Sequence, residues 1–214
     1  GIWHSGSPMA GILNLSKGIL VLVPRNLTKA AGFYNTMLQS DDPALIIECL
    51  NGYRLKEKQP DNIGEFTVPV GKIEVTKQGS DVTLVTYGST WRLVMEAAQE
   101  LEKIGISAEV IDIQSLIPFD LSHEILESVK KTNRLVVIDE DVEGGATAFI
   151  LQQILEKQKA FRYLDSDPLT ISAENHRPPY ASDGDYFSKP SVDDMVEKIY
   201  GLFSEANPAK FPGL

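Results

Sequence analysis

The sequence predicts an α/β fold in which a mostly parallel sheet is flanked by helices. Along the 214 residues, short apolar runs of strand length alternate with segments of helical length. The run at residues 18–24 is apolar almost throughout, as in a strand that helices cover on both faces. Glycine, proline and short polar stretches mark the turns between these segments.

The first 52 residues predict one β-α-β unit. Residues 18–24 form its first strand, Asn26 can cap a helix over residues 27–39, and residues 44–49 form a second buried strand. Such a unit normally makes a parallel crossover. The periodicity is then lost, and the polar residues 53–72 predict a linker between two domains.

A second and longer alternation runs from residue 73 to residue 206 and predicts a separate domain. Its last strand is followed by a loop over residues 174–190, and the tail at residues 207–214 is expected to be irregular. The predicted strands cover residues 73–76, 82–87, 108–113, 134–139 and 169–172, and the predicted helices cover residues 90–104, 120–131, 144–159 and 191–203.

Charge and composition disfavour several classes of partner. The net charge of -10 would repel phosphate backbones, so we expect no nucleic-acid partner. The longest apolar run, residues 19–23, is far shorter than the roughly 20 residues that span a bilayer, so we expect no membrane insertion. The acidic surface can meet a basic partner or can simply keep the protein in solution. With Cys49 as its single cysteine the chain forms no internal disulfide, which suits a reducing compartment.

Three histidines are candidates for chemistry. His4 lies among small residues that allow a ligand close to the backbone, and a neutral imidazole exchanges protons near pH 7. A structural role for His4 remains the alternative. His123 is expected one turn into a helix, as a solvated or capping residue. His176 follows a predicted strand, where sites occur in open α/β sheets, but its proline-rich loop favours a packed or docking surface.

The other reactive groups favour structural roles. Cys49 ends an apolar run, which indicates a buried side chain rather than a reactive thiol. Acidic residues crowd the turn at residues 139–143, before Gly144 and Gly145. They make a phosphate site electrostatically poor, whereas a divalent metal is conceivable and stabilisation of a helix N-terminus is favoured. We therefore assign no metal ligand. Hydrolase, zincin and dithiol motifs do not occur in the sequence.

Five segments together resemble the β-subunits of 2-oxo acid dehydrogenase E1 components, in the transketolase-like superfamily. Residues 78–88 (QGSDVTLVTYG), 110–120 (VIDIQSLIPFD) and 136–140 (VVIDE, followed by two glycines) resemble the transketolase C-terminal domain of that family. Residues 3–8 (WHSGSP) are similar to its active-site histidine-serine loop. Residues 21–48 are similar to the end of its pyrimidine-binding domain. The resemblance therefore implies a partial pyrimidine-binding domain, residues 1–52, followed by a complete C-terminal domain.

The resemblance implies a function for the whole enzyme. In that family the E1 component uses thiamine diphosphate and Mg²⁺ to decarboxylate a 2-oxo acid, and it passes the acyl group to the lipoyl arm of E2. By this resemblance, His4 faces the reacting substrate, where an imidazole could hold the substrate carboxylate, and Ser5 shapes the same loop. Branched-chain substrates such as 2-oxoisovalerate are slightly favoured over pyruvate.

The chain departs from the family pattern at two points. Gly6 stands where family members usually carry glutamine after the His-Ser pair. The glutamate and the aromatic platform that serve the aminopyrimidine ring in the family have no equivalent in this sequence. No cofactor ligand can therefore be assigned here, and we expect a C-terminal fragment that binds no cofactor and is inactive alone.

The resemblance also implies partners and a location. The expected partners are an E1 α-subunit or α-half, a second β copy in a homodimer, and the E2 acyltransferase, for which residues 176–180 and 191–203 are candidate contact surfaces. The expected compartment is the bacterial cytoplasm or, as a second choice, the mitochondrial matrix. Acetoin dehydrogenase E1, 1-deoxyxylulose-phosphate synthase and transketolase are rival enzymes. A non-catalytic module for subunit assembly and docking is the alternative from another class.

Overall fold

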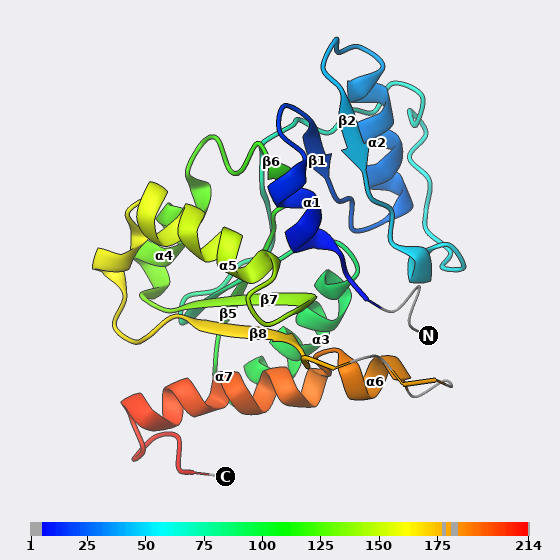
Figure 1. Ribbon diagram of the computed structural model, residues 1–214. Helices are drawn as coiled ribbons and strands as arrows, with labels where there is room; N and C mark the ends of the chain where they lie inside the picture. Colours follow the sequence, from blue (N-terminus) through cyan, green and yellow to red (C-terminus); the bar gives the residue numbers. More distant parts are fainter. Residues whose placement is uncertain (1–5, 177–178, 181–183, 214) are drawn as a thin grey trace.

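Two β-sheets organise the chain (Figure 1). The computed structural model describes residues 6–176, 179–180 and 184–213. The larger sheet has the strand order β3-β5-β4-β7-β8, and its neighbours are parallel except for β3 and β5. These strands are β3 (Glu74–Lys77), β4 (Val82–Thr86), β5 (Ala108–Asp112), β7 (Leu135–Val142) and β8 (Leu169–Ala173). The predicted α/β class with a mostly parallel sheet is confirmed.

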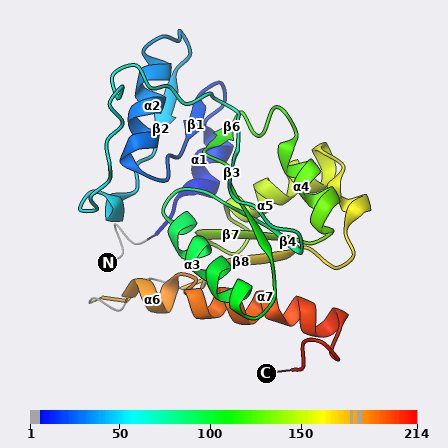
Figure 2. The same ribbon diagram turned by 180° about the vertical axis from the view of Figure 1, so that it is seen from behind.

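Helices cover both faces of the larger sheet because its strands are apolar on both faces (Figures 1 and 2). Helices α3 (Thr90–Lys103) and α7 (Val192–Ala206) pack against one face, where Leu84 and Val110 meet Leu101 and Ile199. The other face is covered by α4 (Glu124–Thr132) and by α5 (Ala146–Leu151), which continues as the π-helix η2 (Gln152–Lys157). A short 3₁₀ helix, η3 (Ala160–Tyr163), follows.

The C-terminal segment is fixed to the larger sheet through α7. Ser191 and Asp194 form a reciprocal capping box at the start of this helix, which satisfies two of the free amide groups there. The tail is irregular, as predicted, but Phe211 is buried and packs edge-on against Tyr200 and Phe203. Phe211 therefore anchors the otherwise exposed tail to the core that α7 covers.

The first part of the chain forms the predicted β-α-β unit, although its second strand is partly exposed rather than buried as predicted. It consists of β1 (Leu20–Leu22), α2 (Leu27–Met37) and β2 (Ala44–Ile46), and β1 and β2 are parallel. The side chain of Asn26 accepts a hydrogen bond from the Lys29 amide at 2.9 Å, so the predicted cap is confirmed. Leu22 and Phe33 are fully buried between the strands and α2.

The smaller sheet is completed by a strand that comes from the second part of the chain. Strand β6 (Ser115–Ile117) pairs antiparallel with β1, so the smaller sheet has the order β2-β1-β6. The Val23 amide extends this contact by donating to the Gln114 carbonyl at 2.8 Å. The sequence did not predict β6. Its pairing joins the two predicted domains by backbone hydrogen bonds.

The predicted linker is packed against α2 at its C-terminal end. After the 3₁₀ helix η1 (Leu50–Gly52), the predicted linker runs along α2, and Val68 is 2% exposed. A side chain at Gly32 would meet Val68 and Phe66 at 2.6 and 2.7 Å, so glycine is what allows the linker to lie against the helix. The domain boundaries at residues 52 and 73 stay a prediction.

Three local predictions differ from the structure. Helix α1 (Met9–Leu15) and helix α6 (Gly184–Ser188) were not predicted, the latter within the expected loop at residues 174–190. His123 does not lie one turn into a helix. It is the N-cap residue of α4 in a left-handed conformation, with φ of 56°. The free amides of α4 are satisfied by Asp120, whose carboxylate accepts from Glu124 at 3.0 Å and from Ile125 at 2.9 Å. Over the described ranges, no helix is both long and apolar enough to cross a membrane.

Candidate functional site

A cleft opens at the carboxyl ends of the neighbouring strands β4 and β7. From β4 the chain crosses to β5 on one side and then returns to β7 on the other, so this is the point where the strand order reverses. Open α/β sheets bind ligands at such a point. Two adjoining hollows, of about 400 and 260 Å³, form the cleft. We call it the sheet-end cleft; both hollows share Cys49, Asn51, Ser89, Glu140 and Lys189.

Different elements line the two hollows. The larger one is bounded by the starts of α3 and α7 and by Tyr186 of α6. Ser89, the N-cap residue of α3, makes no capping hydrogen bond with its side chain. The smaller hollow is bounded by Tyr87 and by the segment from Gly6 to Met9.

The predicted catalytic residues, His4 and Ser5, come directly before a segment that forms one wall of this cleft. His4 and Ser5 lie outside the described residues. Gly6 and Ser7, which follow them directly, line the smaller hollow together with Tyr87 and Glu140. The described part of the histidine-serine segment is therefore brought to the carboxyl edge of the larger sheet. The roles of His4 and Ser5 stay a prediction.

Tyr87 and Asp139 are buried side by side below the cleft. Tyr87 is 4% exposed and Asp139 is 1% exposed. Burial raises the pKa of Asp139 to about 7, and the interaction with the Tyr87 hydroxyl opposes this shift. Burial and the nearby Asp139 raise the pKa of Tyr87 well above its usual value. Within the described part of the chain, neither side chain makes a hydrogen bond of ordinary geometry. Asp139 is thus a carboxyl group that can hold or release a proton near neutral pH.

The other acids of the turn at residues 139–143 have separate roles. Glu140 forms an ion pair with Lys189 at 2.8 Å, which links the end of β7 to the segment before α7. Asp141 accepts a hydrogen bond from the Ala10 amide of α1 at 3.0 Å. Among the residues that the structure describes, no three His, Cys, Asp or Glu side chains gather closely enough to hold a metal ion. The favoured prediction, that acids of this turn stabilise the N-terminus of the helix that follows, is wrong, because α5 has no side-chain cap and no acidic residue in its first turn. Asp141 instead caps α1.

Cys49 borders both hollows but is not an activated thiol. Its Sγ donates a hydrogen bond to the Pro24 carbonyl at 3.3 Å. Burial, with smaller contributions from Glu140 and Asp112, raises the pKa of the thiol to about 12. A nucleophilic cysteine needs a lowered pKa, so Cys49 is not a reactive thiol. Its side chain is half-buried rather than buried as predicted.

The two other histidines do not line the cleft. His123 is exposed at the start of α4. The His176 amide donates to the Glu174 carbonyl at 2.8 Å, just beyond β8. Of the proposed docking segment 176–180, residues 177–178 lie outside the described residues, and Tyr180 is 72% exposed.

A partly buried ion network joins the two parts of the chain. Arg25, which follows β1, binds Glu74 of β3 at 2.9 Å and Asp112 of β5 at 2.7 Å. Its guanidinium carbon lies 4.9 Å from the centre of the Trp91 ring. Lys29 of α2 also pairs with Glu74. The network holds the β-α-β unit against the edge of the larger sheet.

Sequence reasoning missed Tyr87, Lys189 and the long-range role of Asp141. Tyr87 could have been found, because it directly follows a predicted strand and site residues gather at the carboxyl ends of such strands. Lys189 and Asp141 carry no comparable signal. Their partners, Glu140 and Ala10, are far away in the sequence.

The sheet order and the cleft define a doubly wound α/β protein with a ligand-sized hollow at its switch point. The family model that matches is the transketolase C-terminal domain, over residues 71–192. Since this match covers more than half of the 214 residues, the chain belongs to the transketolase C-terminal domain family.

Curated relatives extend the similarity across almost the whole chain. The β subunit of the pyruvate dehydrogenase E1 component from Staphylococcus aureus (strain Mu50) is 33% identical over 192 residues, which is 89% of this chain and 57% of the relative. The corresponding subunit from Rhizobium meliloti (strain 1021) is 32% identical over 198 residues, 92% of this chain and 40% of the relative. The predicted resemblance to E1 β-subunits is confirmed. The chain spans about half the length of these relatives.

A solved structure supports the fold. The split-gene transketolase, an inactive β4 tetramer, aligns with a TM-score of 0.70 at 20% identity and covers 93% of this chain and 62% of its own.

Proposed function

We propose that this chain is part of the E1 component of a 2-oxo acid dehydrogenase complex. The complete enzyme would decarboxylate a 2-oxo acid with thiamine diphosphate and Mg²⁺ and reductively acylate the lipoyl arm of E2. The observation that carries this proposal is the 32–33% identity to pyruvate dehydrogenase E1 β subunits over 89–92% of the chain. The relatives that match favour pyruvate as substrate, and 2-oxoisovalerate is the second candidate.

His4 and Ser5 are proposed to act from the histidine-serine segment. A positively charged or hydrogen-bonding imidazole can hold the carboxylate of a 2-oxo acid and stabilise charge that develops during decarboxylation. The position of Gly6 and Ser7 on the sheet-end cleft supports this role, because it brings the segment to an open edge of the molecule.

The described residues do not fit the cofactor. Two charged cleft residues, Glu140 and Lys189, are paired with each other, and the described residues include no cluster of three potential metal ligands. Asp139 is buried beside Tyr87. To bind a metal ion on a diphosphate, its carboxylate would have to leave this buried position. The ligands of thiamine diphosphate and Mg²⁺ are therefore proposed to lie outside this chain, mainly on an E1 α-subunit or α-half.

The proposed assembly contains this chain, the E1 α partner, a second β copy and E2. The net charge of -10 supports a basic E2 segment as a docking partner, since opposite charges steer association. The bacterial cytoplasm is the proposed compartment, supported by the bacterial relatives.

Reconstitution tests the proposed function. The 214-residue chain alone should not decarboxylate pyruvate or 3-methyl-2-oxobutanoate in the presence of thiamine diphosphate and Mg²⁺. The complete enzyme, with its α partner and all β sequence, should do so and should acylate a lipoyl domain. Turnover by the chain alone would overturn the placement of the cofactor ligands. A complete assembly that forms but stays inactive with both acids would favour the non-catalytic module for assembly and docking.

His4 is tested in the complete enzyme. His4→Ala should lower kcat by about 10²-fold or more, as expected on losing a proton-exchanging or charge-stabilising group. His123→Ala serves as the control, because His123 is exposed and does not line the cleft. An unchanged kcat for His4→Ala would return His4 to a structural role.

A further inference from the structure

Helix α1 is held at its start by a side chain from strand β7. Oδ2 of Asp141 accepts a hydrogen bond from the Ala10 amide at 3.0 Å, across 131 residues of sequence. The N-cap residue of α1 is Pro8, and the helix has no capping side chain of its own. Free amides in the first turn of a helix carry partial positive charge, so a carboxylate is a favourable partner. Asp141 thus supplies a cap that the local sequence lacks.

The Asp141 carboxylate is held in one position by burial and by a second hydrogen bond. Asp141 is 4% exposed, and its Oδ1 accepts a hydrogen bond from the Val142 amide at 2.9 Å. A Cβ atom at Gly145 would come within 2.6 Å of both Cγ and Oδ2 of Asp141. Real Cβ atoms do not approach so closely, so glycine at position 145 leaves the space that the carboxylate fills.

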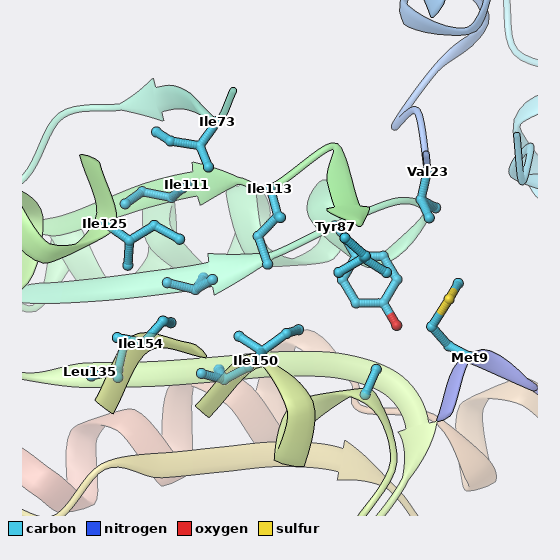
Figure 3. Close-up of a cluster of buried hydrophobic side chains, with 14 of the residues drawn as sticks. Met9, Val23, Ile73, Tyr87, Ile111, Ile113, Ile125, Leu135, Ile150 and Ile154 are labelled. Atoms are coloured by element: carbon cyan, nitrogen blue, oxygen red, sulfur yellow. The ribbon is translucent and has the colours of Figure 1, made fainter. Parts of the chain in front are cut away.

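The position of α1 determines one wall of the sheet-end cleft. Met9 and Leu13 of α1 are buried in the same core as Tyr87 and Ile150, and Figure 3 shows Met9 close to the Tyr87 ring. The residues just before the helix, Gly6 to Pro8, line the smaller hollow. A shift of the helix start therefore moves this wall.

We infer that Asp141 is a positioning residue for the histidine-serine segment. Its carboxylate fixes the first turn of α1 against the end of β7, and His4 and Ser5 are joined to that turn through Gly6–Pro8. The relevance for catalysis rests on the proposed function, whereas the anchoring itself does not. The C-terminal domain would in this way contribute to an active site without touching the substrate.

Amide hydrogen exchange of the 214-residue chain tests the anchoring. Asp141→Leu should raise the exchange rate of the α1 amides about fivefold or more, as for loss of one helix cap. Asp141→Asn keeps the shape and one acceptor oxygen, and it should give a smaller increase. Glu143→Gln is the control, because it removes an exposed carboxylate from the same turn. Amides of β4 report whether a variant has unfolded globally.

Carbethoxylation of His4 by diethyl pyrocarbonate tests the positioning without requiring activity. Mass spectrometry follows His4, with His123 and His176 as internal references. We expect Asp141→Leu to change the His4 rate at least twofold relative to the references, with Asp141→Asn closer to the wild type. Unchanged α1 exchange, or faster exchange with an unchanged relative His4 rate, would overturn the inference. Changes in both support it, and the turnover of the complete enzyme then decides the proposed function separately.

Discussion

Asp139 shows how strongly burial can alter one residue. It ends the apolar part of β7 and lies against Tyr87, so its charged form has lost most of its hydration. Among the described residues, Asp139 forms no ion pair, and neither of its carboxylate oxygens has a hydrogen-bond partner of ordinary geometry. The result is a carboxyl pKa of about 7, against 3.8 for an unperturbed aspartate. Such a group costs the folded protein free energy when it ionises.

The pH dependence of stability follows from this shift. Because the folded pKa of Asp139 is raised above the unfolded value, the folded state binds the proton more tightly, and stability falls as pH rises from about 4 through 7. Asp139→Asn should remove this pH dependence. Its gain in unfolding free energy over the wild type should be larger at pH 8 than at pH 4.5 by roughly 1 to 3 kcal/mol.

Urea unfolding at pH 4.5, 6 and 8 measures the effect of Asp139→Asn. Asp61→Asn, at an exposed position, is the control. The same loss of stability with rising pH in Asp139→Asn and wild type would show that Asp139 does not carry it.

Between elements, the Arg25 network holds α2 and its strands to β3 and β5. The side chains of Arg25 and Asp112 are 10% and 0% exposed. Burial raises the pKa of Asp112 to about 6, and Arg25 opposes that shift. Arg25 and Asp112 therefore form a buried ion pair in which each charge compensates the other for its lost hydration.

Removing one partner of this ion pair should lower the free energy of unfolding strongly. Arg25→Met leaves Asp112 buried without its cation and should lower the free energy of unfolding by about 3 kcal/mol or more at pH 8. The double variant Arg25→Met/Asp112→Asn should be more stable than Arg25→Met. Lys103→Met, which breaks the exposed pair with Glu100, should cost about 0.5 kcal/mol or less. Equal losses for Arg25→Met and Lys103→Met in denaturant titrations would contradict this.

Elements determined by nearby residues could be predicted from the sequence. The strand before Asn26 and the helix after it follow from an apolar run and a local cap. Helix α1 could not be predicted, because its cap is Asp141. Strand β6 is three residues long, and its pairing with β1 depends on how the two parts meet. Lys189 could not be predicted for the same reason, because its partner Glu140 is far away in the sequence. The roles of His4 and Ser5 stay predictions.

For the whole molecule, two sheets share one folded unit. Strand β6, the Arg25 network and the packing of Met9 beside Tyr87 connect them at three places. Neither sheet can lose its structure without exposing core residues of the other. This organisation predicts cooperative unfolding despite the two predicted domains.

Calorimetry tests this cooperativity. The 214-residue chain should unfold in a single transition, with calorimetric and van't Hoff enthalpies that agree. Arg25→Met should lower Tm and keep the single transition, because β6 still joins the sheets. Two resolved transitions in the unaltered chain would instead show that the parts unfold independently.

The position of β6 in the sequence also affects how the protein is made. Strands β1 and β2 leave the ribosome before their third strand, β6, which begins only at Ser115. At roughly 5 to 20 residues per second, translation leaves β1 of this β-α-β unit unpaired on one side for several seconds. During that interval a chaperone could bind the uncovered strand, and release would be timed by the arrival of Ser115–Ile117.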